Sequence, residues 1–252
     1  MRYSVFSITL PGVVASFATL YASCVYSDDI PAPVSPEPLP AWGGSAELGT
    51  NTATGNTDTS SRNGVFSINR KGMAWDFIGR LDALYSEDEG VASKEKYYGS
   101  LQFNRKFSEH SYVAITVDQD RDRFSGYTYQ TTASVGYGYR LVHTDLQHLD
   151  IEAAPGYRRD KLQDSQKVDE EDIIRLALKY SWKINEGTTF TQTANADLGE
   201  GNTIYKTETG LQSQLNGSLA TKLTYQIKYV DDAPDDNKNT DTEFGVTLVY
   251  SF

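Results

Sequence analysis

The chain has 252 residues, a formal net charge of −11 and a hydrophobic content of 38%. This composition is too polar for a helical membrane protein, and past the N-terminus no apolar run approaches the ~18 residues that a spanning helix needs. The acidic balance also argues against nucleic acid as a partner, because phosphate binding needs a basic surface.

The N-terminus is typical of a secretory signal peptide. Arg2 supplies a positive charge, residues 5–20 are mostly apolar, and small residues follow. We therefore expect residues 1–27 to be a signal. Cys24 in "YASC" partly matches a lipoprotein box, although Tyr21 stands where leucine is usual. In the alternative, Cys24 leaves with the signal and the mature chain has no cysteine.

A proline-rich segment follows the predicted signal. Residues 28–41 contain five of the eight prolines in the chain. Such a segment favours extended polyproline conformation and does not pack a core. We expect an exposed periplasmic linker at 28–41.

From residue 42 to the end, apolar and polar residues alternate with the period of a β-strand. In the last segment, Phe244, Val246 and Leu248 share one face with Tyr250 and Phe252. The pattern predicts twelve strands without a helix between them, near 42–50, 60–70, 74–85, 97–107, 112–123, 127–141, 148–160, 172–183, 188–198, 203–215, 219–230 and 241–252.

The connections between these segments alternate between tight turns and longer polar stretches, among them 86–96, 160–172 and 231–241. Outer-membrane barrels have short periplasmic turns and longer outer loops. We therefore predict an all-β fold for residues 42–252, an antiparallel up-and-down transmembrane β-barrel of twelve strands. A secreted β-sandwich is the alternative with the same alternation.

Aromatic residues gather at the strand ends on the apolar face, where rings prefer the headgroup zones of a bilayer. The predicted girdle consists of Trp42, Trp75 and Trp182 at the periplasmic rim and of Tyr85, Tyr97, Tyr127 and Tyr129 toward the outer rim. The terminal Phe252, in phase with Tyr250, resembles the signal that bacterial barrel-assembly machinery recognises.

Several segments together resemble a known family, the salt-induced outer-membrane proteins, which are bacterial barrels of unknown function. The matching stretches are "GSAELGTNTATGNTDTSS" (44–61), "RDRFSGY" (121–127), "SVGYGYRL" (134–141), "APGYR" (154–158) and "VTLVYSF" (246–252). The resemblance implies a barrel in the outer membrane of a Gram-negative bacterium, in contact with its lipid and lipopolysaccharide. It implies no catalytic residue and no cofactor.

The stretch "DQDRDRFSGY" (118–127) places three aspartates two residues apart, like the start of a calcium loop. A calcium loop wants glycine at its sixth position and glutamate at its twelfth, where this chain has Arg123 and Tyr129. The spacing is instead the strand period, so the aspartates face the lumen. Arg121 and Arg123 then share the lipid-facing phase, where they meet either anionic headgroups or plain solvent.

The predicted lumen has an acidic wall and a basic wall. The acidic wall comprises Asp76, Asp82, Asp118, Asp120, Asp122, Asp150 and Glu152. The basic wall comprises Arg175, Lys179, Lys183, Lys206, Lys222 and Lys228. Two outcomes remain open: the walls pair and close the lumen, or water separates them and leaves a polar pore.

An enzyme is not expected. His110, His143 and His148 all fall in or beside short turns, at the wrong end for a rim hydrolase, and no metal-ligand cluster or nucleophile motif appears. We expect a narrow polar pore, passing small polar solutes or ions, or a structural barrel. The link to salt or acid stress comes only from the family's name. A substrate-specific channel, an adhesive barrel that presents acidic loops and a rim hydrolase are the alternatives.

Overall fold

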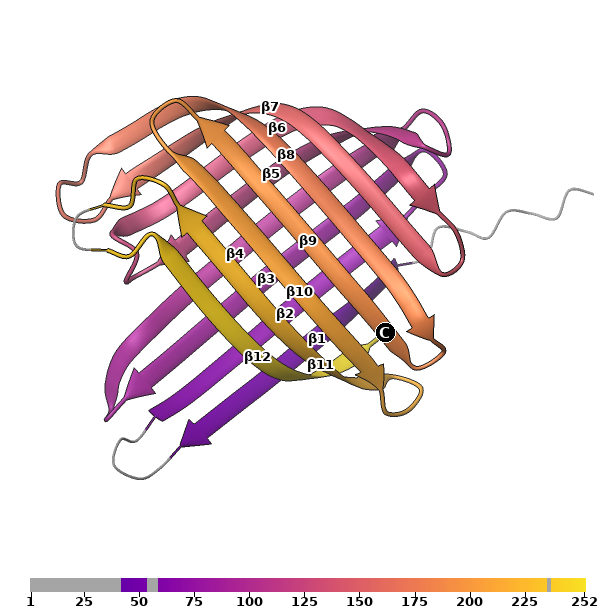
Figure 1. Cartoon of the computed structure of the whole chain (residues 1–252), viewed down its shortest axis with the longest axis horizontal. Coiled ribbons are helices and arrows are strands. Elements are labelled where there is room, and N and C mark those ends of the chain that lie inside the picture. Colours follow the sequence, from indigo (N-terminus) through magenta and orange to yellow (C-terminus); the bar gives the residue numbers. More distant parts are fainter. Residues whose placement is uncertain (1–41, 54–58, 235–236) are drawn as a thin grey trace, which may run out of the picture. The chain divides into compact units, whose positions relative to one another are not determined.

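The computed structural model describes residues 42–53, 59–234 and 237–252, which form an antiparallel β-barrel of twelve strands (Figure 1). The strands are β1 (Trp42–Ala53), β2 (Thr59–Lys71), β3 (Trp75–Asp88), β4 (Val91–Lys106), β5 (Ser111–Asp122), β6 (Tyr127–His143), β7 (Gln147–Leu162), β8 (Val168–Asn185), β9 (Thr188–Gly199), β10 (Thr203–Gln214), β11 (Leu219–Val230) and β12 (Thr240–Ser251). The signal and linker predicted at 1–27 and 28–41 lie outside the described residues. Among the described residues, none belongs to a helix long and apolar enough to cross a bilayer.

Each strand pairs with its neighbours in sequence, and β1 closes the ring against β12, with Leu48 opposite Leu248. Figure 1 shows the strands running as one oblique meander. The predicted up-and-down barrel is confirmed. Closure pairs the backbone of the first and last strands, which in lipid would otherwise be left without hydrogen-bond partners.

The strand period decides which side chains face outward. On β12, Phe244 and Val246 are 69% and 54% exposed, whereas Thr247 and Val249, which follow them in the opposite phase, are 3% and 1% exposed. The apolar phase therefore lies on the outside of the barrel. The opposite phase points into the lumen, so the charges predicted there share one enclosed space.

The tight turns are confirmed, at 72–74, 107–110, 144–146, 186–187 and 215–218. The long connection predicted at 86–96 is wrong. β3 continues to Asp88 and β4 starts at Val91, so only Glu89 and Gly90 form the turn. Both have positive φ, 52° and 79°, as a two-residue hairpin turn that matches the strand twist requires.

The connection predicted at 160–172 is also shorter than expected. β7 and β8 stay paired up to Lys161 and Val168, which leaves residues 163–167 between them. Here the apolar alternation fades while the strand pairing continues. Absence of alternation was therefore misread as absence of a strand.

Six of the seven residues predicted for the aromatic girdle have the expected outward phase, and the expectation is wrong for Tyr127. Trp42, Trp75, Trp182, Tyr85 and Tyr97 are all exposed, and Tyr129 is half-buried. Tyr127 is only 6% exposed, and its hydroxyl accepts a hydrogen bond from Asn202 Nδ2 at 3.3 Å. The register of β6 against β7 shifts between Tyr127 and Tyr129. Such a bulge changes the facing of the residues beyond it, which turns Tyr127 inward.

The C-terminal residue is part of the barrel wall. Phe252 N donates to Gly44 O and Phe252 O accepts from Gly44 N, both at 3.0 Å. Its ring stacks on Phe66 and Tyr250, with ring centroids 6.3 and 6.4 Å away. Tyr250 and Phe252 are exposed on the outward face, as their phase required. Their recognition by assembly machinery stays a prediction.

Candidate functional site

β5 presents its aspartates to the lumen. Val117 and Ile115 are 46% and 40% exposed on the outward face, while Asp122 is 5% exposed. Asp118 and Asp120 share the inward phase of Asp122, with side chains 13% and 17% exposed. Each of the three has a cationic partner, so their spacing serves an ion-pair ladder along one strand. In the described part of the chain, no group of three or more His, Cys, Asp and Glu side chains is placed to hold a metal ion.

Asp120 connects opposite sides of the barrel. Its Oδ2 accepts hydrogen bonds from Lys206 Nζ at 3.0 Å and from Lys228 Nζ at 3.1 Å. Lys228 lies on β11, six strands from β5 in either direction around the ring. Lys228 also donates to Gln130 Oε1 at 3.0 Å, and Lys206 lies 5.4 Å from the ring centroid of Tyr98. The lumen is therefore bridged at this level by side chains.

Asp118 forms a second bridge. It accepts a hydrogen bond from Arg175 on β8 and another from Tyr98 Oη at 3.1 Å. The same guanidinium donates from Nε and Nη2 to the two carboxylate oxygens of Asp197, at 2.6 and 2.8 Å. A planar guanidinium suits such a fork, and it holds Arg175 across from β5.

A third group joins β3 and β1 to β10 and β11. Arg80 contacts Asp82 at 2.8 Å and Glu208 at 2.8 Å, and Lys222 contacts Glu47 at 3.0 Å and Glu208 at 3.7 Å. We call the three groups together the cross-lumen network. Its members are Glu47, Arg80, Asp82, Asp118, Asp120, Arg175, Asp197, Lys206, Glu208, Lys222 and Lys228.

Other predicted acidic-wall residues find cations nearer by. Asp76 contacts Lys106 at 3.0 Å and Arg140 at 3.5 Å. Asp122 contacts Lys96 at 2.9 Å. These cations lie on β4 and β6, which belong to the acidic side of the barrel. The two walls are therefore less purely of one sign than the sequence suggested.

Glu152 is bound by residues from three strands. It accepts hydrogen bonds from Lys179 Nζ at 3.0 Å, Gln102 Nε2 at 3.0 Å and Tyr112 Oη at 2.8 Å. Asp150 is half-buried beside it, and no ion pair of Asp150 is found within the described residues. Lys183 is exposed near the end of β8 and likewise forms no ion pair in the part that the structure covers. Neither belongs to the cross-lumen network.

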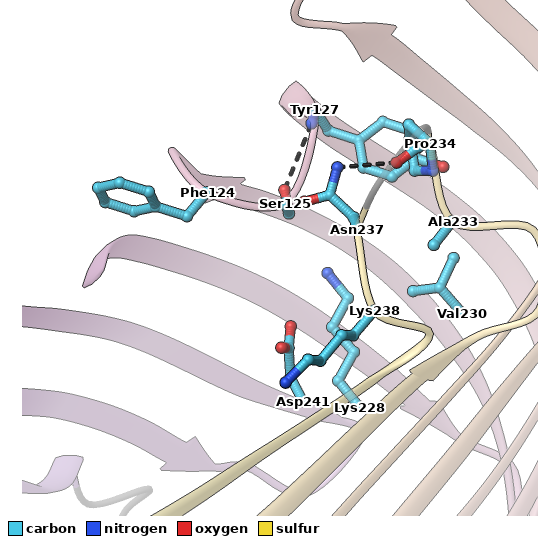
Figure 2. A pocket seen from close by; sticks show the side chains of 10 residues that line it. All are labelled: Phe124, Ser125, Tyr127, Lys228, Val230, Ala233, Pro234, Asn237, Lys238 and Asp241. Atoms are coloured by element: carbon cyan, nitrogen blue, oxygen red, sulfur yellow. Dashed lines mark hydrogen bonds between the residues drawn. The ribbon is translucent and has the colours of Figure 1, made fainter. Parts of the chain in front are cut away.

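A pocket of about 270 Å³ opens at the end of the barrel opposite the tight turns, between the β5–β6 turn and the β11–β12 connection. Figure 2 shows Ser125 and Tyr127 on one side, Asn237 and Pro234 opposite, and Lys228 with Lys238 and Asp241 below. Lys228 belongs both to this pocket and to the cross-lumen network. The pocket thus meets the network at one shared cation.

The outward arginines near the same end are exposed. Arg123 Nη1 donates to Glu95 Oε2 at 2.9 Å, and Arg121 faces outward one residue before the end of β5. Their contact with lipid headgroups stays a prediction. The histidines lie at the short-turn end, where His143 Nδ1 and His148 Nδ1 are 3.1 Å apart and His110 is exposed.

Sequence reasoning missed several members of these clusters. Glu47 faces the lumen and is buried. It lies between the apolar residues Ala46 and Leu48, and this alternation could have predicted its inward direction. Lys96 was assigned to a loop because the predicted strand began one residue later. The search for lumen residues counted only charged side chains. It therefore missed the uncharged hydrogen-bonding residues Tyr98, Gln102 and Tyr112.

Comparison with known proteins finds one family. The family described as "Protein of unknown function, DUF481" matches residues 46–252. No curated protein matches the chain in sequence.

Among solved structures, the NanC porin is 10% identical, with coverage of 83% of this chain and 98% of the porin and a TM-score of 0.49. The KdgM porin is 10% identical, with coverage of 83% and 99% and a TM-score of 0.47. The outer membrane channel DcaP of Acinetobacter baumannii is 9% identical, with coverage of 84% and 96% and a TM-score of 0.41. These likenesses are too distant to carry a function to this chain.

Proposed function

We propose that the chain, which belongs to the DUF481 family, is an outer-membrane barrel whose lumen forms a narrow polar ion pathway, closed at rest by the cross-lumen network. The observation that carries the proposal is the binding of Asp120 by Lys206 and Lys228 from the far side of the barrel. Of the two outcomes open from the sequence, this geometry supports walls in contact.

The outward surface supports the membrane location. Leu48, Leu81 and Phe244 are 72%, 61% and 69% exposed, and similar residues cover the outward phase of the other strands. An apolar surface of this extent is unfavourable in water and favourable in lipid. The exposed rings of Trp42 and Trp75, each within 6 Å of an arginine, suit a headgroup zone. We place the barrel in the outer membrane of a Gram-negative bacterium.

The charged filling favours a pathway over an inert plug. Replacing a buried ion pair by apolar residues of similar volume is often neutral or stabilising, so stability alone does not call for this network. Lys206 and Lys179 also keep 34% and 37% of their side-chain surface exposed. Partly hydrated lysines can leave their partners by rotation about their own bonds. Charged side chains that line such a lumen would then select among ions.

Salt offers a physical way to open the pathway. Raising the salt concentration from 0.1 M to 1 M shortens the screening length from about 10 Å to about 3 Å. The partly exposed pairs of Lys206 would weaken most. This gives a physical meaning to the salt response in the name of the family that the sequence resembles.

Single-channel recording on refolded protein tests the proposal. Wild-type protein should show rare openings at 0.1 M KCl and more frequent ones at 1 M. Asp120→Asn should open more often and prefer anions, because Lys206 and Lys228 lose their shared carboxylate. Lys206→Met with Lys228→Met should prefer cations. Asp145→Asn, in an exposed short turn, is the matched control and should behave as wild type.

A structural barrel is the second candidate, favoured by the same bridging contacts. If the ion pairs serve only to fill the lumen, wild type and both lumen variants should stay silent at either salt concentration. Silence in all of them, with folding confirmed by heat-modifiable migration on a gel, would replace the pathway by this structural role.

A further inference from the structure

The outward surface has a hollow of about 590 Å³ over β1 to β5. Its floor is made of four small outward residues, Ala46, Gly64, Ala83 and Gly99, one from each of β1 to β4. Gly64 lies directly opposite Ala83 in the register of β2 and β3. We call this hollow the lipid-side groove. It runs across neighbouring strands on the face that the proposed function turns toward the bilayer.

Large apolar side chains border the floor. Leu48 lies opposite Gly64, Leu81 opposite Gly99, and Tyr97 opposite Ala83. All three are more than half exposed: Leu48 is 72%, Leu81 61% and Tyr97 52% exposed. The groove is therefore apolar, and lipid chains rather than water are its natural filling.

Gly64 and Gly99 keep the groove open, although the fold does not require glycine at either position. A Cβ at Gly64 would come no closer than 3.6 Å to Leu48, and one at Gly99 would lie 3.4 Å from Leu81, which is ordinary contact. At Gly136 a Cβ would lie 2.3 Å from Ala154 and Ala153 backbone or side-chain atoms. The wall requires glycine at 136 but tolerates a side chain at 64 and 99.

A cation stands at the outer end of the groove. Arg121 lines the hollow and lies opposite Tyr97 in the register of β4 and β5. Within the described residues, no acidic side chain forms an ion pair with it. Arg62 lies on the same face of β2 as Gly64, two residues closer to the β1–β2 connection. Arg123 also lies there but is already paired with Glu95. An apolar groove that ends at a cation is complementary to an acyl chain that ends at an anionic headgroup.

We propose that the lipid-side groove binds one acyl chain of an anionic, phosphate-bearing lipid of the outer leaflet, with Arg121 on the phosphate. The inference rests on the proposed outer-membrane location, but it does not depend on conduction. Free phosphate is excluded as the ligand, because the groove supplies apolar surface that phosphate cannot use. A second copy of the chain is disfavoured, because a two-fold contact through this face would bring Arg121 close to its own copy.

Native mass spectrometry of the refolded full barrel tests the inference with diphosphorylated lipid A as the probe. Wild type should retain one lipid A and should hold phosphatidylcholine of matched chain length roughly tenfold more weakly. Ala83→Leu with Gly99→Leu should fill the groove and lower lipid A retention roughly tenfold. Arg121→Gln should lower lipid A retention several-fold and leave phosphatidylcholine unchanged.

Ala133→Leu, a small outward position on β6, is the matched control and should retain lipid A as wild type does. If the double leucine variant does not fold, Gly99→Ala with Ala83→Val gives a smaller filling and a smaller loss. Equal retention by wild type and filled variants, or equal retention of both lipids, would overturn the inference. Inorganic phosphate that displaces the lipid would show an adventitious ion site only.

The two proposals fail separately. The groove variants should leave channel recordings unchanged, and Asp120→Asn should leave lipid A retention unchanged. A silent barrel that still retains lipid A overturns the pathway alone. A conducting barrel that does not discriminate between lipids overturns the groove alone.

Discussion

Asp120 and Arg121 are neighbours in the chain and lie in opposite environments. Asp120 faces the lumen, where two lysines from the far wall bind its carboxylate at 3.0 and 3.1 Å. Arg121 faces outward, where it lines an apolar groove near the outer rim. A charge on the inner face is compensated by another strand, because the lumen is enclosed. On the proposed function, a charge on the outer face is compensated only near the rim, where headgroups and water would begin.

The largest expected effect comes from removing the inner charges. Asp118→Asn with Asp120→Asn would leave Lys206 and Lys228 without their shared carboxylate and Arg175 with Asp197 alone. Breaking buried pairs in this way costs ~3–5 kcal/mol, and the partial exposure of Lys206 keeps the sum for both sites near that range. Urea unfolding in lipid vesicles should show the loss. An unchanged midpoint, with Asp145→Asn as reference, would mean that these aspartates were hydrated already.

Adding a charge to the outer face should cost less and should depend on height. Val117→Lys places an ammonium group in the apolar band and should destabilise the barrel by ~2–4 kcal/mol. Gln119→Lys lies on the same face one step nearer the rim and should cost ~0–1 kcal/mol. The same unfolding assay compares them. Equal costs at the two positions would show that the band does not end where the girdle indicates.

The smallest effect separates two tyrosines that the bulge in β6 turns to different sides. Tyr127→Phe removes the hydroxyl that accepts from Asn202 and should cost ~0.5–1.5 kcal/mol. For Tyr129→Phe we expect a change near zero, since no hydrogen bond of its hydroxyl is found within the described residues. A larger loss of stability at Tyr129 than at Tyr127 would contradict a bulge that turns Tyr127 inward and leaves Tyr129 outward.

The strand period made the inner face of β5 predictable. Asp118 and Asp120 fall on the same parity as buried residues, and alternation alone assigns them to the lumen. Their partners were not predictable in the same way. Which lysine reaches Asp120 depends on the tilt of the strands and on which residues of β5, β10 and β11 lie at the same level of the barrel. Local periodicity determines neither.

Two further failures have local causes. Tyr127 kept the correct parity in the sequence, and a single bulge reversed it. Lys96 lies where β4 leaves the predicted apolar band, so the sequence placed it in a loop. In the structure it contacts Asp122 at 2.9 Å and Glu243 at 2.5 Å. In both places the backbone continued as strand while the pattern that identifies a strand had changed or ended.

The contact between opposite walls is tested most directly by a double-mutant cycle between Asp120 and Lys228. Unfolding free energies are measured for wild type, Asp120→Asn, Lys228→Met and the double variant. Direct contact predicts a coupling energy of ~1–3 kcal/mol, reduced somewhat because Lys206 still binds Asp120. A coupling energy indistinguishable from zero would show that water separates the walls, and the lumen would then be open rather than closed.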